Sequence, residues 1–185
     1  MEQYQLNIPT LTTTRLKLEP LSMRHSDGMF RMWRNSQVQR YSGQALDEDG
    51  VEIELPAKTP AESDRLIVFW LRAAADGWGF RWAILLGSNH AFIGHVGFNS
   101  LAGWSEIAFH MNPDYWGRGF MTEAAEAAIT WRQENGATGI EAFIEPDNRH
   151  SIALARRLGM EPTECESAGA RRYRMLLSSP ESTPR

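Results

Sequence analysis

The order of extended and helical patterns along the chain is the sequence feature that most narrows its fold. The extended patterns cover residues 14–20, 80–86, 92–98, 106–111, 140–144 and 172–177, and the helical patterns cover residues 22–38, 59–76, 122–135 and 148–158. Strands and helices that alternate in this way exclude an all-α or all-β protein. We therefore expect an α/β (α+β) fold, a sheet with helices on its faces, with a loop or short hairpin at 42–58.

The chain length of 185 residues fits one domain of ordinary size. The start is polar and Thr-rich, and the end is a Ser/Pro tail with nothing to bury. We expect an N-terminal extension at residues 1–13, the folded domain at 14–177 and a disordered tail at 178–185. The single cysteine, Cys165, excludes a disulfide framework and a Cys-rich zinc module, and we expect no metal site.

The charge balance narrows the partners of the protein. Lys and Arg number 19 against 23 Asp and Glu, a formal net charge of −4, which argues against sequence-blind binding to nucleic acid. No apolar run approaches a membrane span, and the N-terminus lacks a signal-peptide pattern. We expect a cytoplasmic protein that binds neither nucleic acid nor membranes.

The segment from Glu106 to Ala124 carries the most chemical information. A strand ends at Pro113, and a loop with Gly117 and Gly119 leads directly into a helix. Such a loop directs unpaired amides and the positive end of a helix dipole at one spot, which suits a phosphate or pyrophosphate. The glycines match neither a Walker loop nor a dinucleotide fingerprint. A tight turn without a ligand explains the two glycines equally well.

The second informative segment runs from Glu145 to Gly159. Asn148 fits a helix N-cap, and capping alone would explain it. Ser151 shares the apolar face of the following helix with Leu154, so its inward hydroxyl needs a partner. That partner is either a carbonyl one turn back in the helix or a bound ligand.

Three pieces of the chain, TTRLKLEPL, EIAFHMNPDYWGRGFMTEA and EPDNRHSIALARRLGM, together resemble the GNAT superfamily of acyl-CoA-dependent N-acyltransferases. Within it they resemble the Rim-type branch of ribosomal-protein N-terminal acetyltransferases. Their order and spacing match over about residues 13–177. The resemblance implies a mostly antiparallel, splayed sheet of about six to seven strands with helices on both faces, in an acyltransferase domain at 14–177.

The resemblance also implies where acetyl-CoA, the co-substrate, binds. The strand before the loop splays from its neighbour, and its exposed edge from Phe109 to Met111 pairs with the pantetheine arm. Asn148 bonds the arm, and Ser151 lies near the thioester sulfur and protonates the departing thiolate. The loop amides that hold the pyrophosphate are those of Gly117, Arg118, Gly119, Met121 and Thr122.

Acylation of an amine requires a proton acceptor near the thioester. Glu106 is our first candidate, because alternation places it on the same face as Ala108 and His110. A solvent-facing glutamate is the alternative, and His110 and His95 are second choices. The acidic stretch 47–54 is either a solvated loop or a rim that attracts a cationic acceptor.

We predict an acetyl-CoA-dependent N-acetyltransferase that transfers directly to a primary amine in a ternary complex. A CoA-binding sensor that no longer transfers is the alternative from another class. The acceptor stays open among a protein N-terminus, a polyamine, an aminoglycoside and an amino-acid-like amine, and homodimer formation stays open too. Of the tryptophans, we expect only Trp104 and Trp116 beside the cleft.

Overall fold

The computed structural model describes residues 7–178, which form one eight-stranded sheet in the order β1-β2-β3-β4-β5-β6-β8-β7. The strands are β1 (Leu11–Thr12), β2 (Leu16–Pro20), β3 (Phe80–Leu86), β4 (Phe92–Ser100), β5 (Trp104–Met111), β6 (Gly139–Ile144), β7 (Glu161–Ser167) and β8 (Ala170–Leu176). The helices are α1 (Ser26–Trp33), α2 (Ser36–Gln39), α3 (Pro60–Ala75), α4 (Phe120–Glu134) and α5 (Arg149–Arg157). All neighbouring strands run antiparallel except β5 and β6, which run parallel.

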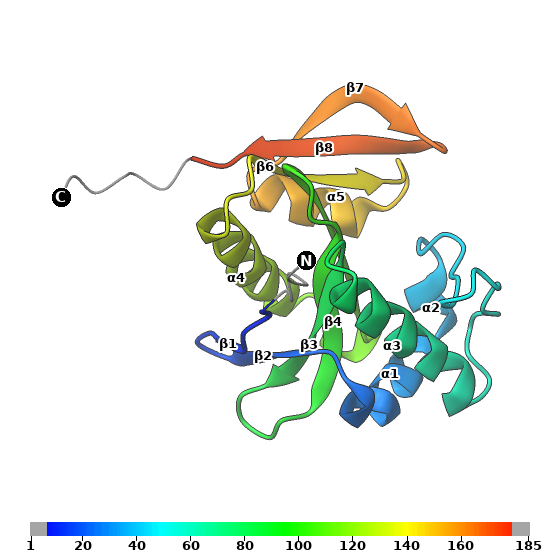
Figure 1. Cartoon of the computed structure of the whole chain (residues 1–185). Helices are drawn as coiled ribbons and strands as arrows, with labels where there is room; N and C mark the ends of the chain where they lie inside the picture. The colour runs from blue at the N-terminus through cyan, green and yellow to red at the C-terminus, as the bar shows by residue number, and fades with distance from the viewer. Residues whose placement is uncertain (1–6, 179–185) are drawn as a thin grey trace, which may run out of the picture.

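The helices cover both faces of the sheet, as Figure 1 shows. Alternation along β3 explains the two layers: Phe80 and Trp82 pack in the core beneath α4 and α5, whereas Ala83 and Leu85 pack beneath α1 and α3. The sheet therefore carries a hydrophobic core on each face. The fold class predicted from the sequence is confirmed, with eight strands in place of six to seven.

The sheet splays open between its two parallel strands. β5 pairs with β6 only at residues 104–106, whereas it pairs with β4 as far as Met111. From Ile107 to Met111, the edge of β5 that faces β6 therefore has no strand partner among the described residues. The predicted splay is confirmed, and it lies beside the glycine loop.

The structure also shows where the element boundaries differ from the sequence patterns. The pattern at 22–38 is divided into a short 3-10 helix (Met23–His25), α1 and α2. α2 is separate from α1 because Asn35 adopts extended backbone and caps α2. β1 adds two residues of sheet before residue 14, and β7 is an exposed polar strand without hydrophobic alternation. The capping box at Thr59 is present as predicted.

The predicted N-terminal extension and C-terminal tail lie partly outside the described residues. The predicted tail falls almost wholly on residues 179–185, which lie outside the described residues, as do residues 1–6 of the predicted extension. Among residues 7–178, no helix is both long enough and apolar enough to span a bilayer. The domain limits at 13/14 and 177/178 stay a prediction.

Candidate active site

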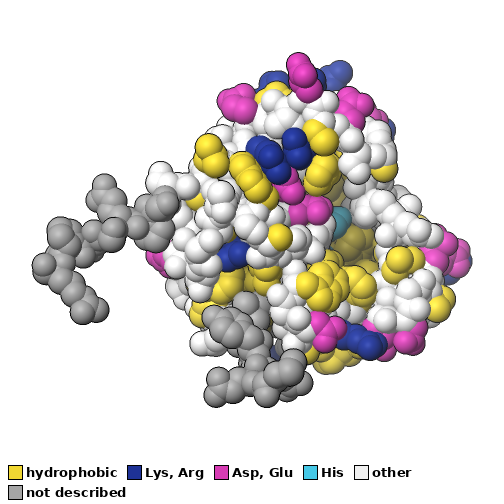
Figure 2. Space-filling view, turned by 45° about the horizontal axis from the view of Figure 1, so that its top comes forward, with side chains coloured by type: hydrophobic (Ala, Val, Ile, Leu, Met, Phe, Trp, Pro, Cys, Tyr) yellow, Lys and Arg dark blue, Asp and Glu magenta, His cyan; other side chains and the backbone are white. Residues whose placement is uncertain are grey.

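A cavity of about 1690 Å³ opens where β5 and β6 part. Its lining comes from both faces of the sheet: from the starts of α4 and α5 on one side, and from α1, α3 and residues 37–46 on the other. Figure 2 shows the face on which the hollow opens, with hydrophobic, acidic and histidine surface inside it. The cavity thus connects the two faces through the gap in the sheet.

The loop between β5 and α4 forms one wall of this cavity. Gly117 and Gly119 have φ values of 72° and 76°, which glycine adopts without the steric cost of a Cβ atom. Gly119 is the N-cap of α4, and among residues 7–178 no side chain caps this end of the helix. The first amides of α4 are therefore open to an anion, as the sequence predicts. The predicted loop residues on the lining are Gly117, Gly119, Met121 and Thr122; Arg118 is not among them.

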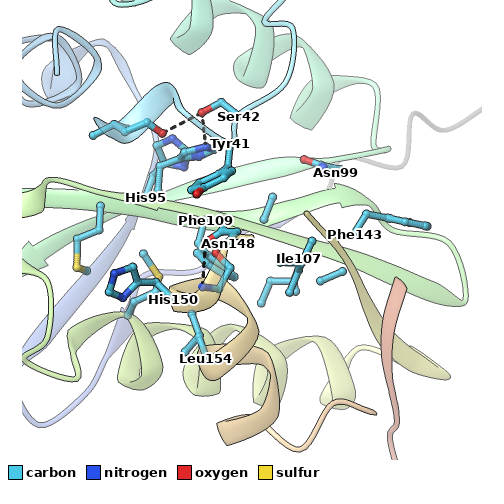
Figure 3. Close-up of a pocket in the computed structure, with 18 of the residues that line it drawn as sticks. Tyr41, Ser42, His95, Asn99, Ile107, Phe109, Phe143, Asn148, His150 and Leu154 are labelled. Atoms are coloured by element: carbon cyan, nitrogen blue, oxygen red, sulfur yellow. Dashed lines mark hydrogen bonds between the residues drawn. The ribbon is translucent and has the colours of Figure 1, made fainter. Parts of the chain in front are cut away.

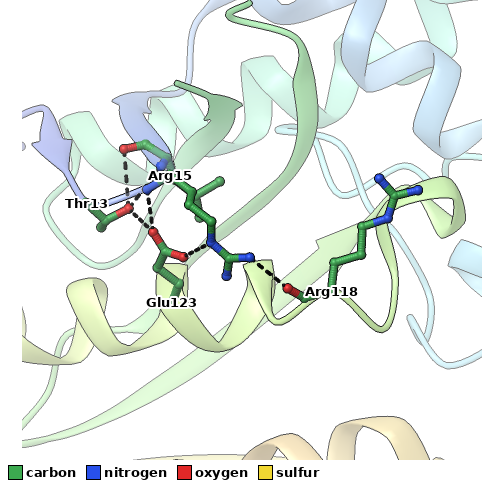
Figure 4. Close-up of polar contacts among 5 residues, drawn as sticks. Thr13, Arg15, Arg118 and Glu123 are labelled. Carbon is green, nitrogen blue, oxygen red and sulfur yellow. Dashed lines mark hydrogen bonds and ion pairs between the residues drawn. The ribbon is translucent and has the colours of Figure 1, made fainter. Parts of the chain in front are cut away.

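Arg15 and Glu123 hold this loop in place (Figure 4). Glu123 Oε2 accepts from Arg15 Nε at 2.7 Å, and Glu123 Oε1 accepts from Thr13 Oγ1 at 2.6 Å and from the Arg15 amide at 2.8 Å. Arg15 Nη1 also donates to the Arg118 carbonyl at 3.0 Å. This link between the start of β2 and the helix N-terminus joins residues 108 positions apart, so no local sequence pattern indicates it.

Replacing Glu123 with Gln should loosen the loop, because the ionised carboxylate accepts all three bonds. Burial raises the pKa of Glu123, but the bonds from Thr13 and Arg15 outweigh it and leave that pKa below its ordinary value. The stabilisation is thus present above about pH 4.5 and is lost as the pH falls through the lowered pKa. We expect Glu123→Gln to lower the melting temperature at pH 7 and to bind acetyl-CoA roughly three- to tenfold more weakly.

Thermal unfolding from pH 7 to pH 3 checks this prediction, with Glu134→Gln at the other, exposed end of α4 as the control. The difference in melting temperature between wild type and Glu123→Gln should shrink toward the acidic end. A difference that stays constant across this range would show that the charge of Glu123 does not hold the loop.

The free edge of β5 presents backbone groups to the gap. The amide of Asn112 donates to Ile93 of β4 at 2.9 Å, so alternate residues direct their amides toward β4. Ile107, Phe109 and Met111 therefore direct their backbone groups toward β6, and none of the described strands pairs with them there. The Met111 carbonyl accepts from Trp116 Nε1 at 2.8 Å, whereas the Met111 amide has no partner among the described hydrogen bonds.

The start of α5 places Asn148 on the opposite side of the gap, as Figure 3 shows, and Ser151 lines the same cavity. Asn148 Oδ1 accepts from the Ser151 amide at 3.2 Å, so the N-cap role of Asn148 is confirmed. The predicted inward face is also present, because Leu154 is buried. Within residues 7–178, Ser151 Oγ has no hydrogen-bond partner. Because Ser151 lines the cavity, its hydroxyl is available to a ligand bound there.

Glu106 lies on the lining at the point where β5 and β6 separate. It is partly buried, and its Oε1 accepts from Asn99 Nδ2 at 2.7 Å. The structure thus brings Glu106, Ser151 and the open edge of β5 into one cavity. Glu106 is not a fully solvated glutamate, which was the alternative from sequence.

Two histidines of the same face form a buried cluster farther along β4 and β5. His95 and His110 are directly paired across the strands, with ring centroids 5.1 Å apart, and the Trp33 ring lies 4.6 Å from His110. Ser42 Oγ donates to the Val38 carbonyl at 3.0 Å, so His110 Nε2 must donate to Ser42 Oγ.

Burial keeps this histidine cluster uncharged. It lowers the pKa of His110 to about 3 and holds the pKa of His95 well below its usual range, in both cases with a smaller contribution from Arg81. The two rings are neutral at pH 7. Neither contacts Glu106 among the described hydrogen bonds, so the structure brings them together with each other and not with the first-choice base.

The structure corrects two expectations about the surroundings of the cleft. Trp33, Trp70 and Trp78 line the cavity along with Trp116, whereas Trp104 does not. None of the carboxylates in the acidic stretch 47–54 lines it either. Within that stretch, Asp47 pairs with Arg65, which lowers the pKa of Asp47, and Glu54 pairs with Lys58 at 2.6 Å.

Among residues 7–178, no three His, Cys, Asp or Glu side chains gather closely enough to hold a metal ion. Cys165 is exposed on β7, and the cavity lining does not include it. The polar side chains on the lining include the Glu106 carboxylate, the Ser151 hydroxyl and the neutral imidazoles of His95 and His110. This set suits proton transfer next to an acyl group held by backbone amides.

Comparison with known proteins decides the family. The family model described as the acetyltransferase (GNAT) domain matches residues 15–161, most of the chain. The chain belongs to the GNAT acetyltransferase family. Among curated relatives of this GNAT domain, the N-acetyltransferase p20 of Bacillus licheniformis is 26% identical over 156 residues, 82% of each chain.

Solved structures support the same assignment for the GNAT fold. An acetyltransferase from Agrobacterium tumefaciens is 25% identical with a TM-score of 0.73, covering 95% of this chain and 98% of that one. RimL, a ribosomal L7/L12 α-N-protein acetyltransferase solved with coenzyme A, is 17% identical with a TM-score of 0.74, covering 93% and 100%. The resemblance to Rim-type acetyltransferases is therefore confirmed in the fold of this GNAT chain.

Proposed function

We propose that this GNAT acetyltransferase moves the acetyl group of acetyl-CoA to a primary amine by direct transfer in a ternary complex. One observation carries the proposal: a single cavity joins the open N-terminus of α4, the unpaired edge of β5 and the carboxylate of Glu106. Its extent suits a long ligand that ends in a reactive group. Similar folds have been solved with coenzyme A in RimL and with acetyl-CoA in MccE.

The binding part of the proposal follows from the backbone. The amides at Gly119, Met121 and Thr122 hold the pyrophosphate, because they are unpaired and share the positive end of the α4 dipole. The outward backbone groups of Phe109 and the amide of Met111 pair with the pantetheine arm as a neighbouring strand would. The side-chain amide nitrogen of Asn148 completes the contact, since its oxygen is already taken by the N-cap bond.

The chemical part assigns roles to two side chains. The amine nitrogen attacks the thioester carbonyl, the carbon–sulfur bond breaks, and the amine proton passes to Glu106 directly or through one water. Ser151 Oγ donates a proton to the departing thiolate and regains one from solvent. The acceptor enters from the face of α1 and α3, because Glu106 and His110 face that side.

The acceptor reaches this site past the aromatic side chains of Trp70 and Trp78, which line the cavity, whereas the carboxylates of the acidic stretch do not. Asp47 and Glu54 are already paired with cations of the chain itself. We therefore assign the acidic stretch to the solvated loop, and no longer to the recognition of a cationic acceptor. A primary amine of unspecified attachment is the acceptor class that the site supports.

Titration with acetyl-CoA, followed by an assay of CoA-thiol release on a panel of amines, tests the proposed function. The panel contains a peptide with a free N-terminus, a polyamine, an aminoglycoside and an amino acid amide. Binding together with release that depends on one amine is the expected result. Binding without release on any amine would instead support the CoA-binding sensor, and absence of binding would overturn both assignments.

Ser151→Ala should lower kcat more than it weakens acetyl-CoA binding, because the thiolate needs its proton only as the bond breaks. A general acid is typically worth about 10²–10⁴ in rate, and less where water substitutes for it. The N-cap bond to the Ser151 amide survives this change, so α5 should stay intact. Single-turnover kinetics and calorimetry measure the two effects, and an unchanged single-turnover rate would leave Ser151 without a chemical role.

A further inference from the structure

Glu106 is the end of a hydrogen-bonded chain that begins at a buried arginine. Arg81 of β3 is 4% exposed, and its Nη2 donates to Asn99 Oδ1. Asn99 Nδ2 in turn donates to Glu106 Oε1 at 2.7 Å. All three residues line the cavity, and Figure 3 shows Asn99 on its wall. Three neighbouring strands, β3, β4 and β5, thus each contribute one residue to this hydrogen-bonded series.

The orientation of the Asn99 amide is fixed by its neighbours. A guanidinium offers only donors, so it must face the amide oxygen, and the amide nitrogen is then left for the carboxylate. The opposite orientation would set donor against donor and acceptor against acceptor. Asn99 therefore presents an N–H group to Glu106, because Arg81 occupies its amide oxygen.

The local backbone and the packing hold these hydrogen-bonded side chains in place. The register of β4 against β5 shifts between Phe98 and Ser100, so Asn99 is the extra residue of a bulge opposite Glu106. A bulge of this kind re-aims a side chain, and such bulges are common beside active sites. Arg81 is fixed as well, because its Nη1 donates to the Phe80 carbonyl at 3.0 Å and its Cζ lies 3.4 Å from the centre of the Trp70 ring.

The carboxylate of Glu106, on the other side of the Asn99 side-chain amide, compensates the positive charge of Arg81. Burial lowers the pKa of Arg81 to about 9, and the carboxylate of Glu106 is the charge that opposes this shift. Arg81 forms no ion pair with a carboxylate among the described residues. Asn99 therefore separates a buried cation from the carboxylate that faces the cavity, and it bonds to both.

We propose that Asn99, oriented by Arg81, is the positioning residue that holds the Glu106 carboxylate toward the acceptor amine. This inference rests on the proposed function, in which Glu106 receives the amine proton. A hydrogen bond to one carboxylate oxygen leaves the other free and fixes its direction. Asn99 donates the one hydrogen bond that the Glu106 carboxylate accepts among the described residues, so its loss frees the carboxylate to rotate. A displacement of about 1 Å costs up to roughly a hundredfold in rate.

The test combines Asn99→Leu with Glu106→Gln and measures kcat for wild type, both single variants and the double variant. Leu has a similar volume and bonds to neither neighbour. Asn99→Leu alone should lower kcat by about ten- to a hundredfold with little change in acetyl-CoA affinity. In the Glu106→Gln background, the same substitution should change kcat less than about threefold, because no carboxylate remains to be positioned.

Two further variants keep the test decisive. Ser100→Ala changes the other residue of the bulge that lies opposite Glu106 and should retain wild-type kcat. Asn99→Asp keeps the size of the side chain and the bond to Arg81, but it sets a carboxylate against Glu106, so it should lose activity even if Asn99→Leu fails to fold.

The outcomes separate this inference from the proposed function. A wild-type chain that turns over while Asn99→Leu lowers kcat equally in both backgrounds would contradict the positioning role alone, and so would full activity of Asn99→Asp. A wild-type chain that binds acetyl-CoA without turnover on any amine would contradict the proposed function, and the positioning role with it.

Discussion

Gly119→Val should bind acetyl-CoA at least about a hundredfold more weakly than the wild-type chain. Gly119 has a φ of 76°, where a β-branched residue is strained by roughly 1–3 kcal/mol. Relief of that strain must rotate the first amides of α4 away from the cavity. A Cβ atom here would lie 3.5 Å from Arg15 Nη2, an ordinary van der Waals distance, so the backbone strain is the cause of the expected loss. Isothermal titration calorimetry measures the loss of affinity.

The control for this substitution is Gly136→Val. Gly136 has a φ of 82° at the other end of the same helix, and a Cβ atom there would meet no atom within 4 Å. The two variants carry a similar backbone strain, and only one of them borders the cavity. Equal affinities for acetyl-CoA in the two folded variants would show that the loop does not hold the pyrophosphate.

Glu106→Gln should lower kcat by about 10²–10⁴ and leave acetyl-CoA affinity close to that of wild type. Gln has nearly the same shape and keeps an oxygen for the bond from Asn99, so the loss is confined to proton acceptance. Steady-state and single-turnover rates with the best amine of the panel measure it.

Glu141 offers a matched control for this effect. It lies directly opposite Glu106 in the parallel register, pairs with Arg174 at 2.8 Å and does not line the cavity. Glu141→Gln should therefore retain most of the activity. If Glu106→Gln were as active as Glu141→Gln, the amine proton would have to leave through water or His110 instead.

The parts of the site that the sequence predicts are those that depend on residues close together in the chain. The glycine loop, the N-cap at Asn148 and the inward face of α5 depend on residues within about one helical turn of one another. Glycine and cap chemistry act through local backbone geometry, so the pattern and the structure agree. The splay of the sheet between β5 and β6 came from the resemblance, and the register confirms it.

The parts that the sequence did not predict depend on partners far along the chain. Arg15 and Glu123 meet only because β2 passes the start of α4, and Arg81 meets Asn99 only because β3 pairs with β4. β7 lacks hydrophobic alternation because it is an exposed edge strand, so its strand character depends on pairing with β8. Long-range pairing of this kind leaves no periodic signal to recognise.

A crystal structure of the complex with acetyl-CoA would show where this chain holds its co-substrate. We expect the pyrophosphate at the amides of Gly119 to Thr122, the pantetheine arm along the free edge of β5, and the acetyl group between Glu106 and Ser151. An acetyl group on the far side of β6, or a pyrophosphate held away from the N-terminus of α4, would contradict this arrangement.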